Sequence, residues 1–152
     1  MKIFVGYGYN KRDEWIKEYV FPVIEAFGDE VVTGGKLHGE IITEAIRQKI
    51  AESDALIGFL TRRGDADSKG VWKTHRWVID EITTAINSNI PVLEVREKGV
   101  DDQGGIAGDR QRIEYEEGAR DKLLVELTTT LGNWHSFEDV KLKLLPDECV
   151  QE

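Results

Sequence analysis

Two adjacent acids, Asp80 and Glu81, stand inside the apolar segment HRWVIDEITTAI. At about 100° per residue, the apolar side chains of this segment fall on one side of a helix; they are Val78, Ile82, Ala85 and Ile86. Asp80 then points into solvent, whereas Glu81 lies on the flank of the apolar stripe, one turn after Trp77. We therefore expect Glu81 alone to line a cleft. The structural alternative is a half-buried glutamate that covers the helix edge.

The pattern of apolar residues predicts short strands alternating with helices. The strands are expected over 2–7, 29–33, 54–61, 90–95 and 112–115, and the helices over 13–27, 40–52, the segment that carries Glu81, and 119–131. Pro22 should kink or restart the first helix. Such an alternation predicts an α/β fold, a flavodoxin-like parallel sheet of five strands in the order 2-1-3-4-5 with helices on both faces.

The length of 152 residues is that of one domain. We expect residues 1–135 to form this domain. Residues 136–152 fit no further element and are expected to be a tail or the beginning of a linker. No run of 18 apolar residues, no signal-peptide pattern and only one cysteine are present. A cytoplasmic protein without disulfides or a cysteine metal site is the simplest expectation.

The net charge of −9 restricts the partners of this protein. Nucleic acids and anionic membranes are bound through an excess of Lys and Arg, and here the balance is the opposite. We therefore expect neither nucleic acid nor membrane as a partner. An anionic nucleotide would need local groups that attract it against the overall field.

Loops at the carboxyl ends of parallel strands are where ligands bind in such folds. Here they are residues 6–13, 33–39, 61–72 and 96–110. The first begins as G-x-G, but Lys11 stands where the dinucleotide fingerprint needs its third glycine. P-loop and G-x-S-x-G motifs are absent, and Thr61 follows the third strand where a receiver domain would have a phosphorylatable aspartate.

Three longer motifs resemble a known family. They are IFVGYGYNKRD, VVTGGKLHGEIITEAIRQKIAESDALIGFLT and RWVIDEITTAI, and the resemblance as a whole covers about residues 2 to 134. Their order and spacing resemble a TIR (Toll/interleukin-1 receptor) domain, in particular the NAD-cleaving members of bacterial antiviral defence. The resemblance implies that Glu81 is the catalytic carboxylate. In that family a tryptophan stands four residues before the catalytic glutamate, and Trp77 occupies the same position here.

The resemblance also implies the substrate contacts and the partners. The residues implied to bind NAD⁺ are Gly6, Tyr7, Tyr9, Lys36, Thr61 and Trp77, and those implied to mediate self-association with other TIR domains are Gly35, Lys36, Leu37 and His38. A fused or associated sensor domain is a further implied partner. No cofactor is expected, because NAD⁺ is the substrate.

One carboxylate suits the cleavage of NAD⁺. Ordinary glycosidases use two, because a poor oxygen leaving group must be protonated. Nicotinamide leaves NAD⁺ as a neutral molecule, so the enzyme needs only to stabilise the positive charge that develops on the ribose. The product, ADP-ribose or a cyclic form, cannot be read from the sequence.

Two other functions fit the same residues. One is a non-catalytic TIR adaptor that uses the 34–39 loop only to bind other TIR domains. The other is an enzyme like nucleoside 2-deoxyribosyltransferase, which has a related fold and an active-site glutamate.

Overall fold

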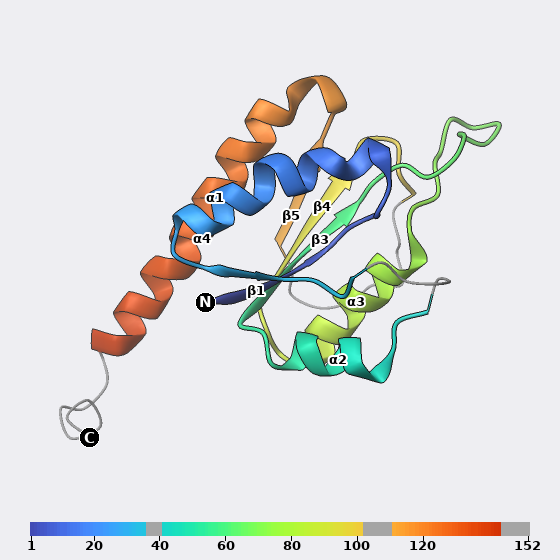
Figure 1. The fold of residues 1–152 in the computed structure, drawn as a ribbon. Coiled ribbons are helices and arrows are strands. Elements are labelled where there is room, and N and C mark those ends of the chain that lie inside the picture. The colour runs from blue at the N-terminus through green and yellow to red at the C-terminus, as the bar shows by residue number, and fades with distance from the viewer. Residues whose placement is uncertain (36–40, 102–110, 144–152) are drawn as a thin grey trace.

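Five parallel strands form one sheet in a computed structural model of the chain, which describes residues 1–35, 41–101 and 111–143 (Figure 1). The strands are β1 (Lys2–Gly6), β2 (Glu30–Val32), β3 (Ala55–Leu60), β4 (Val92–Glu97) and β5 (Gln111–Tyr115). Their order is β2-β1-β3-β4-β5. This confirms the predicted α/β fold and the predicted strand order, and it places the reversal of strand order between β1 and β3.

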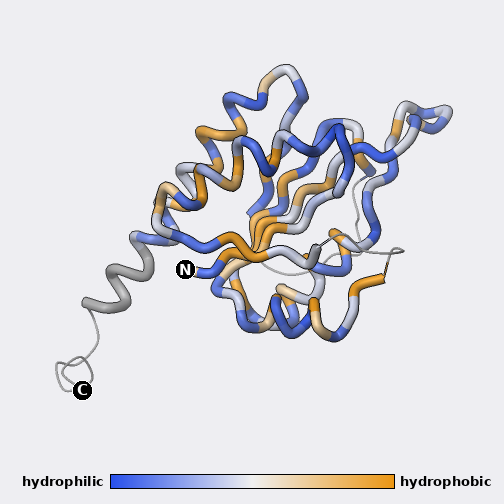
Figure 2. Tube along the Cα trace, in the orientation of Figure 1, coloured by the Kyte–Doolittle hydropathy of each residue, from blue (hydrophilic) through white to orange (hydrophobic). Residues whose placement is uncertain are grey.

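Helices cover both faces of the sheet. α1 (Phe21–Ala26) and α4 (Arg120–Lys143) pack on one face, and α2 (Glu44–Ala51) and α3 (Arg76–Asn87) pack on the other (Figure 1). Alternation along β1 divides its side chains between two cores, because Ile3 and Val5 face α1 and α4 whereas Phe4 faces α2 and α3. β3 is buried at every position, so it lies at the centre of the apolar sheet (Figure 2).

The first helical segment restarts at Pro22, as predicted. A short 3₁₀ turn (Lys11–Asp13) and a π-helical segment (Ile16–Val20) precede α1, and Pro22 occupies the first turn of α1. Proline has no N–H to donate and clashes with the preceding turn, so a regular α-helix cannot run through this position.

The last helix is longer than predicted. A 3₁₀ turn (Glu117–Ala119) leads into α4, which continues to Lys143. The prediction that 136–152 fit no further element is therefore wrong for residues 136–143. Side chains beyond the predicted end hold the helix to the domain, since Trp134 packs on the core and His135 contacts buried Asp29 at 2.8 Å. The domain boundary at 135 stays a prediction.

In the part of the chain that the structure describes, no helix combines the length and the apolar character that crossing a membrane requires.

Candidate active site

The Glu81 carboxyl lies at the carboxyl ends of β1 and β2, next to the reversal of strand order between β1 and β3. A Cβ atom built on Gly6, the last residue of β1, would lie 2.6 Å from Glu81 Oε1. A Cβ atom on Gly34, in the loop after β2, would lie 3.4 Å from Glu81 Oε2. The carboxyl therefore occupies the space that two side chains would otherwise fill, at the position where open parallel sheets bind their ligands.

Two glycines let α3 approach the sheet this closely. Gly6 pairs with Gly58 in the register of β1 and β3. A Cβ atom on Gly58 would meet Ile82 Cγ1 at 2.6 Å, just as one on Gly6 would meet Glu81. Adjacent residues of α3 thus rest on adjacent glycines of the sheet.

Glu81 is more deeply buried than the sequence predicted, with only 3 % of its surface exposed. The helical pattern placed it at an edge between apolar surface and water. The backbone at Gly6 and Gly34 closes over this edge because neither residue has a side chain that would keep the chain away. Asp80 is half-buried, and its carboxylate lies 3.5 Å from Arg76 on the outer side of α3.

One oxygen of the Glu81 carboxyl is buried without a hydrogen-bond partner among the residues that the structure describes. Oε1 is inaccessible and has no hydrogen-bond partner, and no cationic side chain of the described segments forms an ion pair with it. Burial, with a smaller contribution from Asp80, raises the pKa of Glu81 from 4.5 to about 8. A carboxyl kept in this state is costly, and such groups occur most often at functional sites.

Three aromatic residues of the predicted site contact one another, and one of them, Tyr9, lies near Glu81. The Trp77 indole N–H donates a hydrogen bond to the Tyr7 carbonyl oxygen at 3.2 Å, and the rings of Tyr7 and Tyr9 lie 4.4 Å apart. Burial raises the pKa of Tyr7 to about 12. Burial also raises the pKa of Tyr9; the Thr33 hydroxyl opposes this rise, and nearby Glu81 adds to it. The structure therefore links Trp77, Tyr7 and Tyr9 and places Tyr9 near Glu81, whereas the Tyr7 ring packs in the core that α1 and α4 cover.

The remaining predicted residues are placed differently. Thr61 is fully buried, and its hydroxyl donates a hydrogen bond to Asp13 at 2.8 Å. Gly35 is exposed and has a φ of 76°, which glycine adopts without strain. Lys36, Leu37 and His38 lie outside the described residues.

A buried polar cluster beside the site was not found from the sequence. It joins buried Asp13, Thr61 and His75 with exposed Asn10: His75 Nε2 lies 3.5 Å from Asp13 Oδ2 and 3.3 Å from Asn10 Nδ2. His75 Nδ1 is buried without a partner among the described residues. A Cβ atom on Gly8 would overlap this cluster, so the G-x-G spacing of Gly6 and Gly8 was the available signal.

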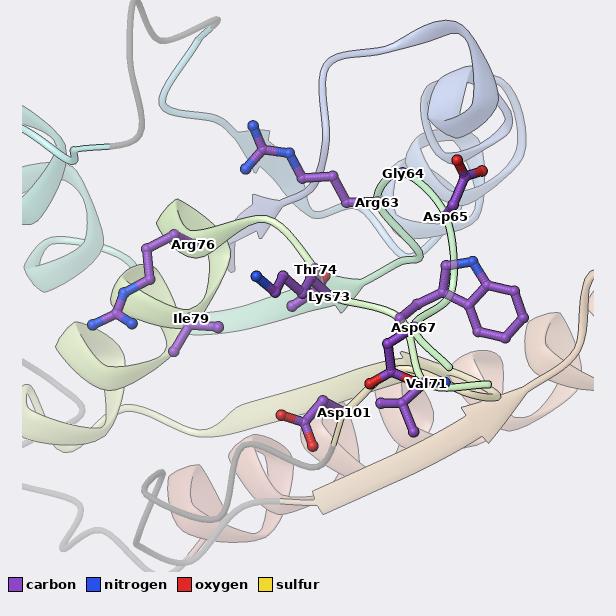
Figure 3. A pocket seen from close by; sticks show the side chains of 11 residues that line it. Arg63, Gly64, Asp65, Asp67, Val71, Lys73, Thr74, Arg76, Ile79 and Asp101 are labelled. Atoms are coloured by element: carbon purple, nitrogen blue, oxygen red, sulfur yellow. Dashed lines mark hydrogen bonds between the residues drawn. The ribbon is translucent and has the colours of Figure 1, made fainter. Parts of the chain in front are cut away.

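A separate open groove of about 960 Å³ lies at the start of α3 (Figure 3). Its walls come from the 63–74 loop, from Arg76 and Ile79 of α3, and from Asp101 after β4. Ile79 and Glu81 are two residues apart and project from opposite sides of the helix. The groove and the carboxyl therefore lie on two flanks of α3.

No group of three or more His, Cys, Asp or Glu side chains suited to a metal ion occurs within residues 1–35, 41–101 and 111–143.

The fold and the carboxyl define an α/β protein with a buried acid at the switch point of its sheet, and solved structures share this fold. No protein-family model and no curated protein matches the sequence. A structure of the Clostridium botulinum CMP N-glycosidase is similar with a TM-score of 0.59 and 14 % identity, over 86 % of this chain and 99 % of that one.

Two further structures are similar. A 2-deoxyribosyltransferase from Bacillus psychrosaccharolyticus has a TM-score of 0.53 and 14 % identity, over 77 % of this chain and 87 % of that one. The Vibrio vulnificus NanR protein complexed with ManNAc-6P has a TM-score of 0.50 and 14 % identity, and this chain spans only 53 % of its length. At these identities the similarity establishes the fold.

Proposed function

We propose that this protein is an enzyme that cleaves the N-glycosidic bond of a nucleoside, a nucleotide or NAD⁺, with Glu81 as the catalytic carboxylate. The observation that carries the proposal is the buried Glu81 carboxyl, which lacks a counter-ion among the described residues and lies at the switch point of the sheet. Breaking this bond leaves positive charge on the sugar at C1′. An anion in a dry site stabilises that charge far more than one in water does.

The raised pKa of Glu81 gives this chemistry a defined pH dependence. Only the ionised carboxylate can stabilise the sugar cation, and a pKa of about 8 leaves the free enzyme largely protonated at neutral pH. The cationic nicotinamide ring of NAD⁺ would favour the ionised form by direct attraction, so binding would release a proton. Because Oε1 lies against Gly6 and is inaccessible, a substrate can contact this atom only after the residues that pack on it move.

The similar solved structures support a nucleoside or nucleotide as the substrate. Two of them are described as an N-glycosidase of CMP and as a 2-deoxyribosyltransferase, which act on the bond between a base and a sugar. For such substrates the departing base is neutral before cleavage and benefits from protonation.

NAD⁺ is the second candidate, together with membership of the TIR family. The order of the three sequence motifs supports it, and so does the absence of a second carboxylate paired with Glu81 in the described site, since nicotinamide needs no proton to leave. Hydrolysis or cyclisation of NAD⁺ in antiviral defence, activated by self-assembly through the 34–39 loop, belongs to this candidate.

A non-catalytic adaptor is less well supported. A buried acid without a partner destabilises the fold, and an adaptor gains nothing from it. Natural proteins retain such costly features mainly where function needs them.

The test compares Glu81→Gln with Asp80→Asn, its neighbour on the outer side of α3. Wild-type protein and both variants are incubated with NAD⁺, CMP and a deoxynucleoside, and the release of free base is measured by chromatography at several protein concentrations. We expect Glu81→Gln to reduce cleavage by at least 100-fold and Asp80→Asn to change it little. Equal losses in both variants, or no release from any substrate by the wild type, would refute the proposal.

A further inference from the structure

The groove at the start of α3 concentrates positive charge in a strongly acidic protein. Arg63, Lys73 and Arg76 line it, although the whole chain has a net charge of −9. In Figure 3 these three side chains extend toward the side of α3, with their ends apart from one another, whereas Asp67 and Asp101 lie toward the opposite wall. The groove therefore has a cationic wall and an acidic wall.

Lys73 and Arg76 retain most of their capacity to bind an anion. Lys73 is exposed and forms no ion pair within the described segments. Arg76 contacts Asp80 at 3.5 Å, but its side chain is 68 % exposed, and a pair this open contributes little. Arg63 is also exposed, and its backbone N–H donates to the Lys73 carbonyl oxygen at 2.8 Å, which holds these two parts of the loop together.

The acids of the groove restrict where an anion can lie. Asp67 Oδ1 accepts the backbone N–H groups of Lys69 and Val71, so this carboxylate is used within its own loop. Repulsion by Asp65, Asp67 and Asp101 leaves the wall of α3 as the favourable position for negative charge. The first turn of α3 contains no acid, and its backbone dipole adds to the attraction there.

Apolar side chains complete a surface suited to an organic anion. Val71, Trp72 and Ile79 line the same groove as the cations. Arg62 covers one face of the Trp72 ring at 3.9 Å and Gly99 approaches the ring closely, so this tryptophan is held in place. A volume of about 960 Å³ is of the size that accommodates a nucleotide.

We propose that the groove binds the phosphate groups of a nucleotide through Lys73 and Arg76. This site is distinct from the Glu81 carboxyl, and its link to catalysis rests on the proposed function. Arg76 and Glu81 are five residues apart, about 7.5 Å along the axis of α3 and on different sides of a helix about 10 Å wide. A substrate with its reacting ribose at Glu81 and its phosphates in the groove must be long, as a dinucleotide is.

The test is a binding measurement with ADP and adenosine as probes, by isothermal titration calorimetry. The wild type is compared with the double variant Lys73→Ala and Arg76→Ala, and with Lys69→Ala, which removes an exposed lysine of the same loop that does not line the groove. Circular dichroism checks that all three proteins are folded.

We expect the wild type and Lys69→Ala to bind ADP with equal affinity, the double variant to bind at least tenfold more weakly, and adenosine to bind poorly. Added salt should weaken the binding of ADP. Equal affinity for adenosine and ADP, equal affinity of the wild type and the double variant for ADP, or no binding of ADP at millimolar concentration would overturn the proposal.

Kinetics separates this proposal from that on Glu81. The double variant should have a higher KM for NAD⁺ than the wild type. Its KM for nicotinamide riboside, a nucleoside without phosphate, should equal that of the wild type. Binding of ADP without cleavage of any substrate would refute the proposed function and support the groove. Cleavage with equal KM values in both proteins would refute the groove as a substrate site.

Discussion

Replacing Glu81 with glutamine should stabilise the protein at neutral and alkaline pH. The pKa of this carboxyl is about 8 in the folded chain and 4.5 in its ordinary state, chiefly because of burial. The folded state therefore holds the proton more tightly than the unfolded state. Stability is unaffected below pH 4.5, where both states are protonated, and falls as pH rises from 4.5 through 8, where only the unfolded state ionises freely.

The size of this effect follows from the two pKa values. Each pH unit between them corresponds to about 1.4 kcal/mol, so the cost is about 3 kcal/mol at pH 7 and approaches about 5 kcal/mol above pH 8. Glutamine has nearly the same shape and cannot ionise. The unfolding free energy of the Glu81→Gln variant should therefore not fall with pH in the way that ionisation of Glu81 makes it fall in the wild type.

The assay is urea-induced unfolding of the wild type and Glu81→Gln at intervals from pH 5 to pH 8.5. The difference in unfolding free energy should be about 1 kcal/mol or less at pH 5 and should widen steadily in favour of the variant. A difference that stays constant with pH would refute the argument. So would a wild type that gains stability relative to the variant as the pH rises, because that would require a cation paired with Glu81.

Three further predictions follow from the same contacts. For the proposed cleavage, kcat/KM should rise about tenfold per pH unit up to about pH 8 and then level, because this profile reports ionisation of Glu81 in the free enzyme. Gly6→Ala should abolish cleavage while the protein stays folded, because its Cβ would displace Glu81 Oε1; Gly118→Ala, with open space around it, serves as the control, and equal activity of the two variants would contradict the placement of the carboxyl. Asp29→Ala should lower the unfolding free energy by about 2 kcal/mol in thermal or urea denaturation, because it leaves both His135 on α4 and the ammonium group of Met1 without their buried partner. An unchanged stability would show that this contact does not hold the end of α4.

Much of the fold was predictable because it depends on local patterns. The continuous apolar run of β3 and the alternating strands and helices predicted the parallel sheet, and 2-1-3-4-5 is a common strand order of such doubly wound sheets. Pro22 marked a break in the first helix for a reason intrinsic to proline. The end of α4 was missed because the contact of His135 with Asp29 joins residues 106 positions apart.

The candidate site was predictable only in part. Helical spacing correctly separated Glu81 from Asp80, since residues on one helix have a fixed angular relation. Spacing within one helix cannot reveal which residues of the sheet pack against it. Here these residues are the glycines Gly6 and Gly58, and their lack of a side chain matters only because β1 and β3 pair with the two glycines side by side.

The amino-acid sequence by itself determined the elements, their order in the sheet and the acid that faces inward, because these follow from periodicity and from the geometry of single residues. Tertiary structure alone decided how deeply that acid is buried, and that Asp13 and His75 meet beside it. It also decided that Lys73 and Arg76 share a groove with Asp101. Burial and electrostatic environment depend on segments distant in the chain, so a pKa or a binding groove is defined only after the chain has folded.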